Sequence, residues 1–211
     1  VQYANQLSSL FLVTGLQSNP SPSNLKISKI NLNGITYCHG NLVILKKYAP
    51  SVFEKYVTTV TYGGKEIRLN LYDTAGQDDY DRLRPLSYQN ANLVLVCYDV
   101  TNPTSFENVL IKWYPEVNHF CSDVPVILIG CKTDLRKDKE RTRRLKAMDQ
   151  APITYTQGEE TRQHMSAELY LECSAKYREN VEDIFRDATK KALASSRRAR
   201  HRMKKRHCVI L

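Results

Sequence analysis

The sequence of 211 residues contains no apolar run long enough to cross a membrane. Its longest uninterrupted apolar stretches are Leu10 to Val13, Leu42 to Leu45, Leu93 to Tyr98 and Val124 to Ile129. A spanning helix needs about 20 apolar residues, so we expect no transmembrane helix. Internal repeats are also absent from the sequence.

The six cysteines form no C-x-x-C pair, and two of them lie inside apolar runs that are typical of buried strands. They are Cys38, Cys97, Cys121, Cys131, Cys173 and Cys208. Scattered, unpaired cysteines are typical of a reducing cytosol.

Acidic residues are missing from the last 24 positions, which hold nine Lys or Arg. The formal net charge of +9 comes from this tail, because 22 Lys and Arg before Ala188 are balanced by 22 Asp and Glu. A basic tail on a neutral body indicates that the tail meets an anionic surface. Aromatic residues are not interleaved with the basic ones, so we expect no nucleic-acid partner.

What the sequence does contain, from Val57 onward, is an alternation of strand and helix patterns. Residues Val57 to Val60, a Gly63-Gly64 turn and the period-two run from Ile67 to Leu71 predict a hairpin. Continuous apolar runs predict parallel strands that are buried on both faces, and these runs are Leu93 to Val100, Val124 to Cys131 and Leu169 to Cys173.

One helical pattern is especially clear, with apolar residues at i, i+3, i+4, i+7 and i+11. These residues are Val181, Ile184, Phe185, Ala188 and Ala192. Strands that alternate with helices predict one α/β domain in which helices flank a mostly parallel sheet. Its composition, 42% hydrophobic and 9% aromatic, is enough for a single core.

Residues 1–47 break this order. The cluster from Ser18 to Asn24 (SNPSPSN) predicts a loop or linker. The segments from Leu25 to Leu32 and from Leu42 to Leu45 are candidate short strands.

Three loops after the predicted strands carry groups suited to binding a nucleotide. In an open α/β sheet, ligands bind at the carboxyl ends of the strands. In the loop Asp73 to Gln77, a carboxylate can hold Mg²⁺, a glycine N–H can approach a phosphate and a glutamine can orient water. In Lys132 to Asp134 a carboxylate can accept both N–H donors of a guanine edge, and the backbone N–H groups of Ser174 to Lys176 can meet the guanine oxygen.

The motifs DTAGQ, K-T-D and C-S-A-K, in this order and spacing, resemble those of Ras-superfamily GTPases. The stretches YAPSVFEKY (Tyr48 to Tyr56), DYDRLRPLSY (Asp79 to Tyr88) and WYPEV (Trp113 to Val117) resemble the Rho branch. So does the charged insert Leu135 to Leu145, where Rho proteins carry an extra helix. The resemblance covers about 164 of 211 residues, and it implies a six-stranded small G domain of the P-loop NTPase type.

The resemblance also implies roles for individual residues. Gln77 would be catalytic, and Asp73 and Ser51 would ligate Mg²⁺, Ser51 standing where most relatives have Thr. The residues implied to bind GTP or GDP are Asp73, Gly76, Lys132, Asp134, Ser174, Ala175 and Lys176. The residues implied to contact effectors are Tyr48, Ala49, Pro50, Ser51, Val52 and Phe53. Asp73 to Tyr88 would be switch II.

Each of these residues also has a purely structural interpretation when it is considered alone. Asp73 fits a turn residue after a strand, Ser51 a surface hydroxyl and Asp134 a helix N-cap.

The family motif G-x-x-x-x-G-K-[ST], whose backbone N–H groups, Lys and hydroxyl cradle phosphates and Mg²⁺, has no match here. Five residues separate Gly34 from Gly40, and Gly40 is followed by Asn41. We therefore expect the family's first strand and phosphate loop to be replaced, with weakened binding of nucleotide and Mg²⁺. We interpret residues 1–47 as an alternative exon or a mispredicted gene model. The alternative is a divergent isoform in which Leu25 to Leu32 substitutes for the first strand.

The chain ends in Cys208-Val209-Ile210-Leu211, a C-a-a-X box whose final Leu favours geranylgeranylation of Cys208. Upstream, Arg197 to His207 contains seven Lys or Arg, and one lipid plus a polybasic patch satisfies the two-signal requirement for stable anchoring. The expected location is the cytoplasmic face of the plasma membrane, with a solvated basic helix end or a nuclear signal as the alternative interpretation.

The predicted organisation is an atypical segment at 1–47, an incomplete Rho-type G domain at 48–194 and a polybasic tail at 195–211. The resemblance implies a GTP-hydrolysing switch that regulates actin organisation, such as filopodia-type protrusion. Its implied partners are Rho-type effectors, exchange factors and GTPase-activating proteins. The alternative is a membrane-tethered effector-binding module without nucleotide.

Overall fold

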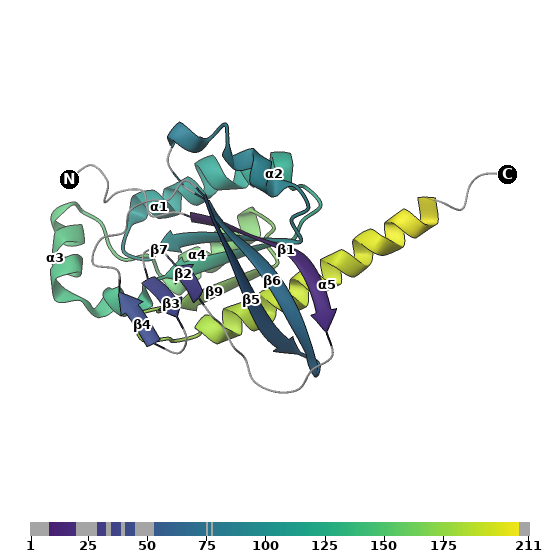
Figure 1. Cartoon of the computed structure of the whole chain (residues 1–211). Coiled ribbons are helices and arrows are strands. Elements are labelled where there is room, and N and C mark those ends of the chain that lie inside the picture. The colour runs from purple at the N-terminus through teal and green to yellow at the C-terminus, as the bar shows by residue number, and fades with distance from the viewer. Residues whose placement is uncertain are drawn as a thin grey trace.

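The computed structural model of the chain describes residues 9–19, 29–32, 35–38, 41–44, 53–74, 76 and 78–206. Six strands form one sheet in the order β5-β6-β1-β7-β8-β9 (Figure 1). Their bounds are β1 Ser9–Asn19, β5 Phe53–Tyr62, β6 Lys65–Thr74, β7 Leu93–Asp99, β8 Val126–Cys131 and β9 Leu169–Cys173. The predicted α/β fold with a six-stranded sheet is confirmed.

The predicted hairpin is formed by β5 and β6, which pair antiparallel from Phe53↔Thr74 to Tyr62↔Lys65. Its two-residue turn consists of Gly63 and Gly64, which adopt φ of 58° and 72°. Two positive φ values in succession match the twist of a tight hairpin, and glycine adopts them without steric cost.

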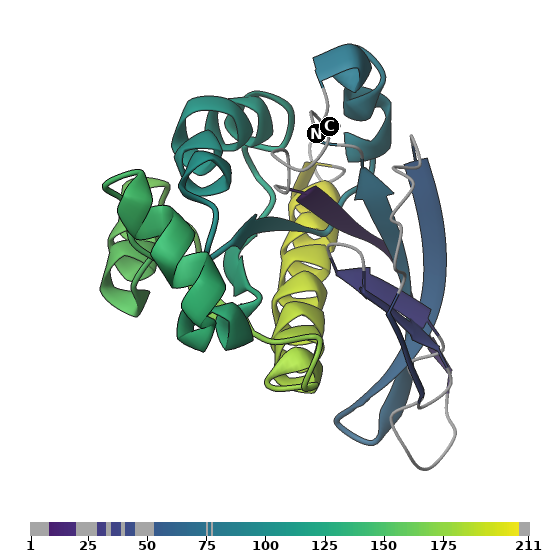
Figure 2. The ribbon, with the colours of Figure 1, turned by 90° about the vertical axis from the view of Figure 1, so that its left-hand side faces the viewer.

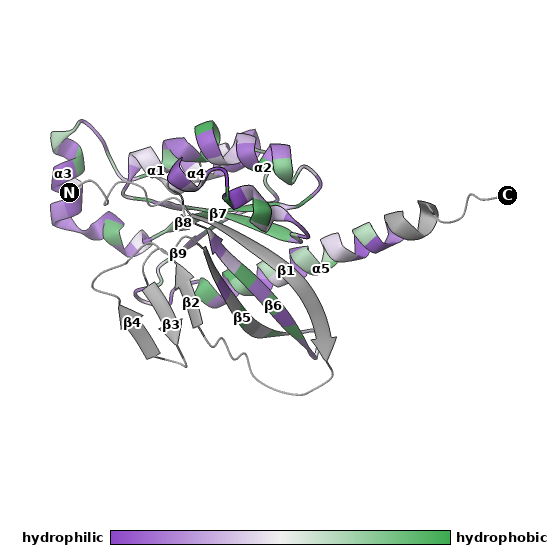
Figure 3. Ribbon diagram, turned by 45° about the horizontal axis from the view of Figure 1, so that its top comes forward, coloured by the Kyte–Doolittle hydropathy of each residue, from purple (hydrophilic) through white to green (hydrophobic). Residues whose placement is uncertain are grey.

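The three continuous apolar runs form the parallel part of the sheet, in which β7 pairs with β8 and β8 with β9. Every residue of β7 is buried. Burial on both faces explains why these runs lack the alternation of a half-exposed strand. In Figure 3 β7 and β8 are mostly green, whereas α3 is largely purple.

Helices cover both faces of this sheet (Figures 1 and 2). The helices are α1 Pro103–Asn108, the π-helix η3 Val109–Trp113, α2 Tyr114–Phe120, α3 Lys139–Ala147, α4 Tyr155–His164 and α5 Val181–Arg206. Three 3₁₀ turns are η1 Asp78–Tyr80, η2 Arg84–Tyr88 and η4 Thr133–Lys137. The predicted apolar stripe of α5, which includes Ile184, Phe185 and Ala188, packs on one face, and Trp113 and Val117 pack on the other.

The central slot between β6 and β7 is filled by β1, which runs antiparallel to both neighbours. Between Thr14 and Gln17, β1 has one more residue than β6 has between Asn70 and Arg68, which is a β-bulge. The remaining N-terminal strands, β2 Lys29–Leu32, β3 Ile35–Cys38 and β4 Asn41–Ile44, form a separate antiparallel sheet. The suggestion that Leu25 to Leu32 replaces the first strand is therefore wrong.

The segments predicted as short strands agree with β2 and β4, and the predicted insert helix agrees with α3. The tail expected to begin at residue 195 continues α5 as helix to Arg206. Within the described chain, none of the helices has the length and hydropathy required to cross a membrane.

Candidate functional site

The two loops predicted to read a guanine base meet at one edge of the sheet. Lys132 to Asp134 follow β8, and Ser174 to Lys176 follow β9. Because β8 and β9 are parallel neighbours, their carboxyl ends lie side by side. The Ser174 hydroxyl donates a hydrogen bond to Asp134 Oδ1 over 2.6 Å, which joins the two loops directly.

The backbone of the first loop turns sharply at Lys132, which has φ 62° and ψ 40°, and η4 begins behind it. The Leu135 N–H donates to the Lys132 carbonyl over 2.9 Å. Lys132 occupies the N-cap position and Asp134 lies within the first turn. The interpretation of Asp134 as a helix N-cap is therefore wrong, and its carboxylate is instead bonded to the neighbouring loop.

The second loop is closed by a short antiparallel bridge between Ser174 and Glu179. The Ser174 N–H donates to the Glu179 carbonyl over 3.1 Å, and the Glu179 N–H donates back over 2.9 Å. Ser174 is fully buried, Ala175 is half-buried and Lys176 is exposed. The bridge sets the path of the backbone that is predicted to face the guanine oxygen.

Asp99 is a site residue that the sequence pattern did not reveal. Its side chain is 1% exposed, and its carboxylate accepts from Lys132 Nζ over 2.9 Å. The other carboxylate oxygen accepts from the N–H and the hydroxyl of Thr101, over 2.8 and 2.7 Å. A buried carboxylate is stable only with such partners. The sequence feature that could have indicated Asp99 as a site residue is that it ends an otherwise apolar strand.

The structure describes only part of the predicted phosphate side of the site. Asp73 and Thr74 are buried at the carboxyl end of β6. Gly76 is half-buried, and its carbonyl accepts from Lys112 Nζ over 3.2 Å. A carboxylate such as Asp73 is a suitable Mg²⁺ ligand. Ala75 and the predicted catalytic Gln77 lie outside the described residues.

The residues implied to contact effectors, with the implied Mg²⁺ ligand Ser51 among them, precede β5 or begin it. Tyr48, Ala49, Pro50, Ser51 and Val52 all lie outside the described residues, and Phe53 is described only as the first residue of β5. Among the side chains that the structure describes, no three His, Cys, Asp or Glu residues are arranged to hold a metal ion.

The reversed direction of β1 changes which segment lies near the phosphate side. Leu10 pairs with Thr74, and Ser9 pairs with Cys97, so β1 begins at the edge that carries the two loops predicted to read a guanine base. Its carboxyl end, Asn19, pairs with Glu66 at the opposite edge. A phosphate loop lies where a strand ends and a helix begins. The carboxyl end of β1 therefore lies at the edge opposite the predicted nucleotide loops, where it cannot lead into a phosphate loop beside them.

The segment predicted as switch II is anchored to η3 and α2. Lys112 Nζ pairs with the carboxylates of Asp78 and Asp81, the latter over 3.1 Å. Arg84, whose side chain is 1% exposed, pairs with Asp81 over 2.6 Å and with Glu116 over 2.7 Å. Burial opposes ionisation of Asp81, but hydrogen bonds from Arg84 and Lys112 still lower its pKa.

The anchored segment presents apolar side chains to solvent. Leu83 and Leu86 are 54% and 68% exposed, and Ile111 of the adjacent η3 is 73% exposed. Leu83 and Leu86 belong to the segment predicted as switch II, so both are accessible to a protein that binds this segment.

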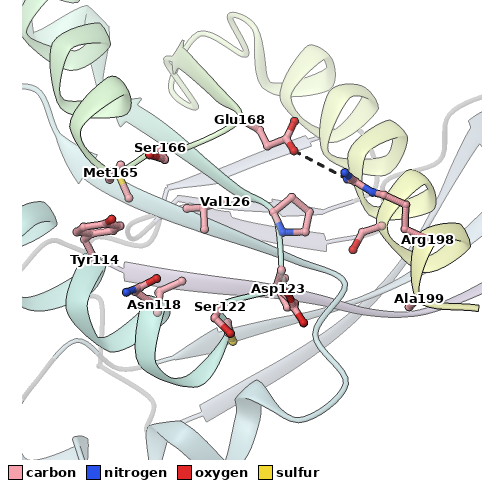
Figure 4. Close-up of a pocket in the computed structure, with 15 residues that line it drawn as sticks. Tyr114, Asn118, Ser122, Asp123, Val126, Met165, Ser166, Glu168, Arg198 and Ala199 are labelled. Carbon is pink, nitrogen blue, oxygen red and sulfur yellow. Dashed lines mark ion pairs between the residues drawn. The ribbon is translucent and has the colours of Figure 1, made fainter. Parts of the chain in front are cut away.

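A separate hollow of about 530 Å³ lies away from these loops, between α2, β8 and α5 (Figure 4). Asn118, Asp123 and Met165 line it, and an ion pair between Glu168 and Arg198 spans 3.9 Å on one side. None of the predicted site residues that the structure describes lines this hollow.

Comparison with known proteins agrees with the fold. The sequence model of the Ras family matches residues 35–194. The chain therefore belongs to the Ras family, whose members are GTPases.

The individual relatives place the similarity in the Rho branch. The chain is 63% identical to "Rho-related GTP-binding protein RhoF" of Mus musculus over 177 residues, which are 84% of this chain and 83% of that protein. It is 65% identical to RhoF of Homo sapiens over 164 residues, or 78% of each chain. Identity to "Rho-related GTP-binding protein RhoD" of Homo sapiens is 48% over 166 residues, 78% of this chain and 79% of that protein. The predicted resemblance to Rho GTPases is confirmed, and the identity to RhoF is higher than the identity to RhoD.

Proposed function

We propose that this chain is a Rho-type signalling protein that recognises guanine nucleotides through the loops that follow β8 and β9. The observation that carries the proposal is the hydrogen bond between Ser174 and Asp134, which joins the two base-reading loops. The ion pair between Lys132 and Asp99 fixes the loop that follows β8 to the end of β7. The names of the relatives, Rho-related GTP-binding proteins, support the same ligand class.

The hold on the phosphates is expected to be weaker than in a relative with a phosphate loop. Charge-assisted hydrogen bonds contribute roughly 1.5 to 3 kcal/mol each. The loss of three lowers affinity by about 5 kcal/mol or more, which is on the order of several thousand-fold. GTP hydrolysis with Gln77 as catalytic residue, and Mg²⁺ held by Asp73 and Ser51, would require the nucleotide to remain bound.

The experiment is a titration of the purified chain with fluorescent GDP, GTP and ATP, with and without Mg²⁺. Weak binding that prefers guanine nucleotides over ATP supports the proposal. Equal affinity for GDP and ATP would overturn base recognition, and purification with stoichiometric bound GDP would overturn the expected weakness.

A second candidate function is an effector-binding module that works without nucleotide. The anchored switch II favours it, because Lys112 and Arg84 fix this segment through ion pairs to Asp81 and Glu116. Rho-type effectors, exchange factors and GTPase-activating proteins are the proposed partners. Retention of a Rho effector domain by the nucleotide-free chain supports this candidate. Loss of retention in a Leu83→Asp, Leu86→Asp variant would assign the binding to these two exposed leucines.

We further propose attachment to the cytoplasmic face of the plasma membrane, where Rho-type proteins would act on actin organisation and filopodia-type protrusion. The support is the C-terminal C-a-a-X box at Cys208 and the basic residues of α5, such as Arg197 and Arg200, which are exposed. One prenyl chain plus a polybasic patch gives stable binding to an anionic leaflet. Cys208→Ser should release the protein into the soluble fraction, and unchanged membrane fractionation of this variant would count against the proposal.

A further inference from the structure

A polar network beneath the base-reading loops is not explained by contact with a nucleotide. Its centre is the ion pair between Arg136 of η4 and Glu172 of β9. The Arg136 guanidinium donates to both Glu172 carboxylate oxygens, each over 2.6 Å. It also donates twice to the Ile153 carbonyl, over 2.9 and 2.7 Å. A planar guanidinium that binds a carboxylate with two parallel bonds fixes orientation as well as distance.

The network continues from Glu172 into the sheet. The Tyr170 hydroxyl donates to Glu172 Oε1 over 2.5 Å, and the Tyr98 and Tyr170 hydroxyls lie 2.6 Å apart. Since the single hydroxyl proton of Tyr170 is used toward Glu172, Tyr98 is the donor of the second bond. Burial, the neighbouring Tyr98 and the bond to Glu172 raise the pKa of Tyr170, so its hydroxyl remains a donor at neutral pH.

The positions of these residues in the chain relate the network to the site. Arg136 lies two residues after Asp134, Glu172 lies two residues before Ser174, and Tyr98 immediately precedes Asp99. The network therefore touches each of the three segments that carry the polar groups of the base-reading site.

Close packing holds Tyr170 in this position. A Cβ added at Gly158 of α4 would lie 2.1 Å from a ring carbon of Tyr170, and one added at Gly130 of β8 would lie 2.7 Å from its hydroxyl. These short distances mean that two neighbouring elements leave room for the Tyr170 ring only because they have glycine there.

From this arrangement we propose that the pair Arg136–Glu172 is a positioning device that sets the distance between Asp134 and Ser174. In this role Arg136 and Glu172 act on the base only through the two loops that they hold in place. This inference rests on the proposed recognition of guanine, but its first test requires no ligand.

The ligand-free test is amide hydrogen exchange on the full chain, compared with Arg136→Lys and Glu172→Gln. Two amides report on the loops, Leu135 through its bond to the Lys132 carbonyl and Glu179 through its bond to the Ser174 carbonyl. Both should exchange about tenfold faster in the variants, because loss of the two-pronged bond allows the loops to open locally. The amides of the β7–β8 ladder should keep their wild-type rates.

The matched control is Glu168→Gln, which weakens another partly buried ion pair between separate elements. Lys191 and Glu168 lie 2.5 Å apart with side chains 28% and 33% exposed, against 25% and 14% for Arg136 and Glu172. This control should leave the exchange rates of Leu135 and Glu179 unchanged. If Arg136→Lys and Glu172→Gln accelerated exchange equally at all amides, including those of the β7–β8 ladder, the pair would be merely structural and the proposal would be overturned. Wild-type exchange rates at both Leu135 and Glu179 in these variants would also overturn it.

The second test is a titration with guanosine, and adenosine is the comparison. Binding is detected through the amide chemical shifts of the loops after β8 and β9. Arg136→Lys and Glu172→Gln should each weaken guanosine binding about tenfold, whereas the affinity of Glu168→Gln should stay close to that of the wild type. Absence of guanosine binding in the wild-type chain would refute base recognition and leave the positioning device to be decided by the exchange rates. Unchanged guanosine affinity in both Arg136→Lys and Glu172→Gln would overturn the proposed positioning role.

Discussion

Replacement of Glu116 by Ala should destabilise the chain by about 3 kcal/mol, because it removes a carboxylate partner from a buried cation. The Arg84 side chain is 1% exposed and is shared between Glu116 and Asp81. Breaking a buried ion pair costs roughly 3 to 5 kcal/mol, and the remaining bond to Asp81 reduces this cost. The Tyr88 hydroxyl, which also donates to Glu116, loses its partner and adds about 1 kcal/mol.

The assay is urea denaturation followed by fluorescence of Trp113, whose ring lies 4.8 Å from the Arg84 guanidinium carbon. A lower midpoint with an unchanged slope reports a change in stability alone. Glu140→Ala is the matched control, because the pair Arg144–Glu140 is 68% and 62% exposed and its loss should cost less than about 0.5 kcal/mol.

A second variant distinguishes the cost of leaving a buried charge without Glu116 from the cost of lost side-chain packing. Glu116→Leu combined with Arg84→Met removes both charges and should recover most of the lost stability, since apolar replacement of a buried pair is often neutral. A cost below about 1 kcal/mol for Glu116→Ala alone would refute the reasoning that Arg84 depends on Glu116.

Three further predictions concern the base site, the packing of Tyr170 and the response to acid. Asp134→Asn should weaken guanosine binding and favour xanthosine, because an amide can donate where the carboxylate accepts; nucleoside titration by NMR checks this, and unchanged guanosine preference would contradict it. Gly158→Ala should lower stability by about 2 kcal/mol in thermal unfolding, because the new methyl would overlap Tyr170, and a gain in stability from higher helix propensity would contradict it. The folded-state pKa of Asp81 is lowered from the usual 3.8, so its stabilising effect is present above that value and lost as pH falls below about 4; Asp81→Asn should therefore cost stability at pH 7 and much less at pH 3.

Several elements could be predicted because their signals are local. The apolar runs of β7 and β8 and the spacing of Ile184, Phe185 and Ala188 in α5 follow directly from burial. The Gly63-Gly64 turn specifies the hairpin through its positive φ values. The loops that contain Asp134 and Ser174 could be placed at one edge because parallel strands end together.

Other features of the site depend on residues that are far apart in the chain. Asp99 could not be recognised as the partner of Lys132, because 33 positions separate them. The pairing of Arg136 with Glu172 bridges 36 positions, and only strand order brings them together. Long side chains of opposite charge occur throughout the sequence, and nothing in their local pattern indicates which of them meet.

The sequence by itself determined that the chain carries the Rho-type motifs K-T-D and C-S-A-K and lacks a phosphate-loop motif, since both are read from the order and identity of residues. Only the tertiary structure decided which segment fills the central slot of the sheet and in which direction. An apolar run such as Leu10 to Val13 has the same periodicity in either direction, and backbone hydrogen bonds can form with parallel or antiparallel neighbours. The choice of the antiparallel direction for β1 depends on its pairing with β6 and β7, whose residues lie more than 40 positions away. This direction sends the end of β1 to the edge opposite the base-reading loops.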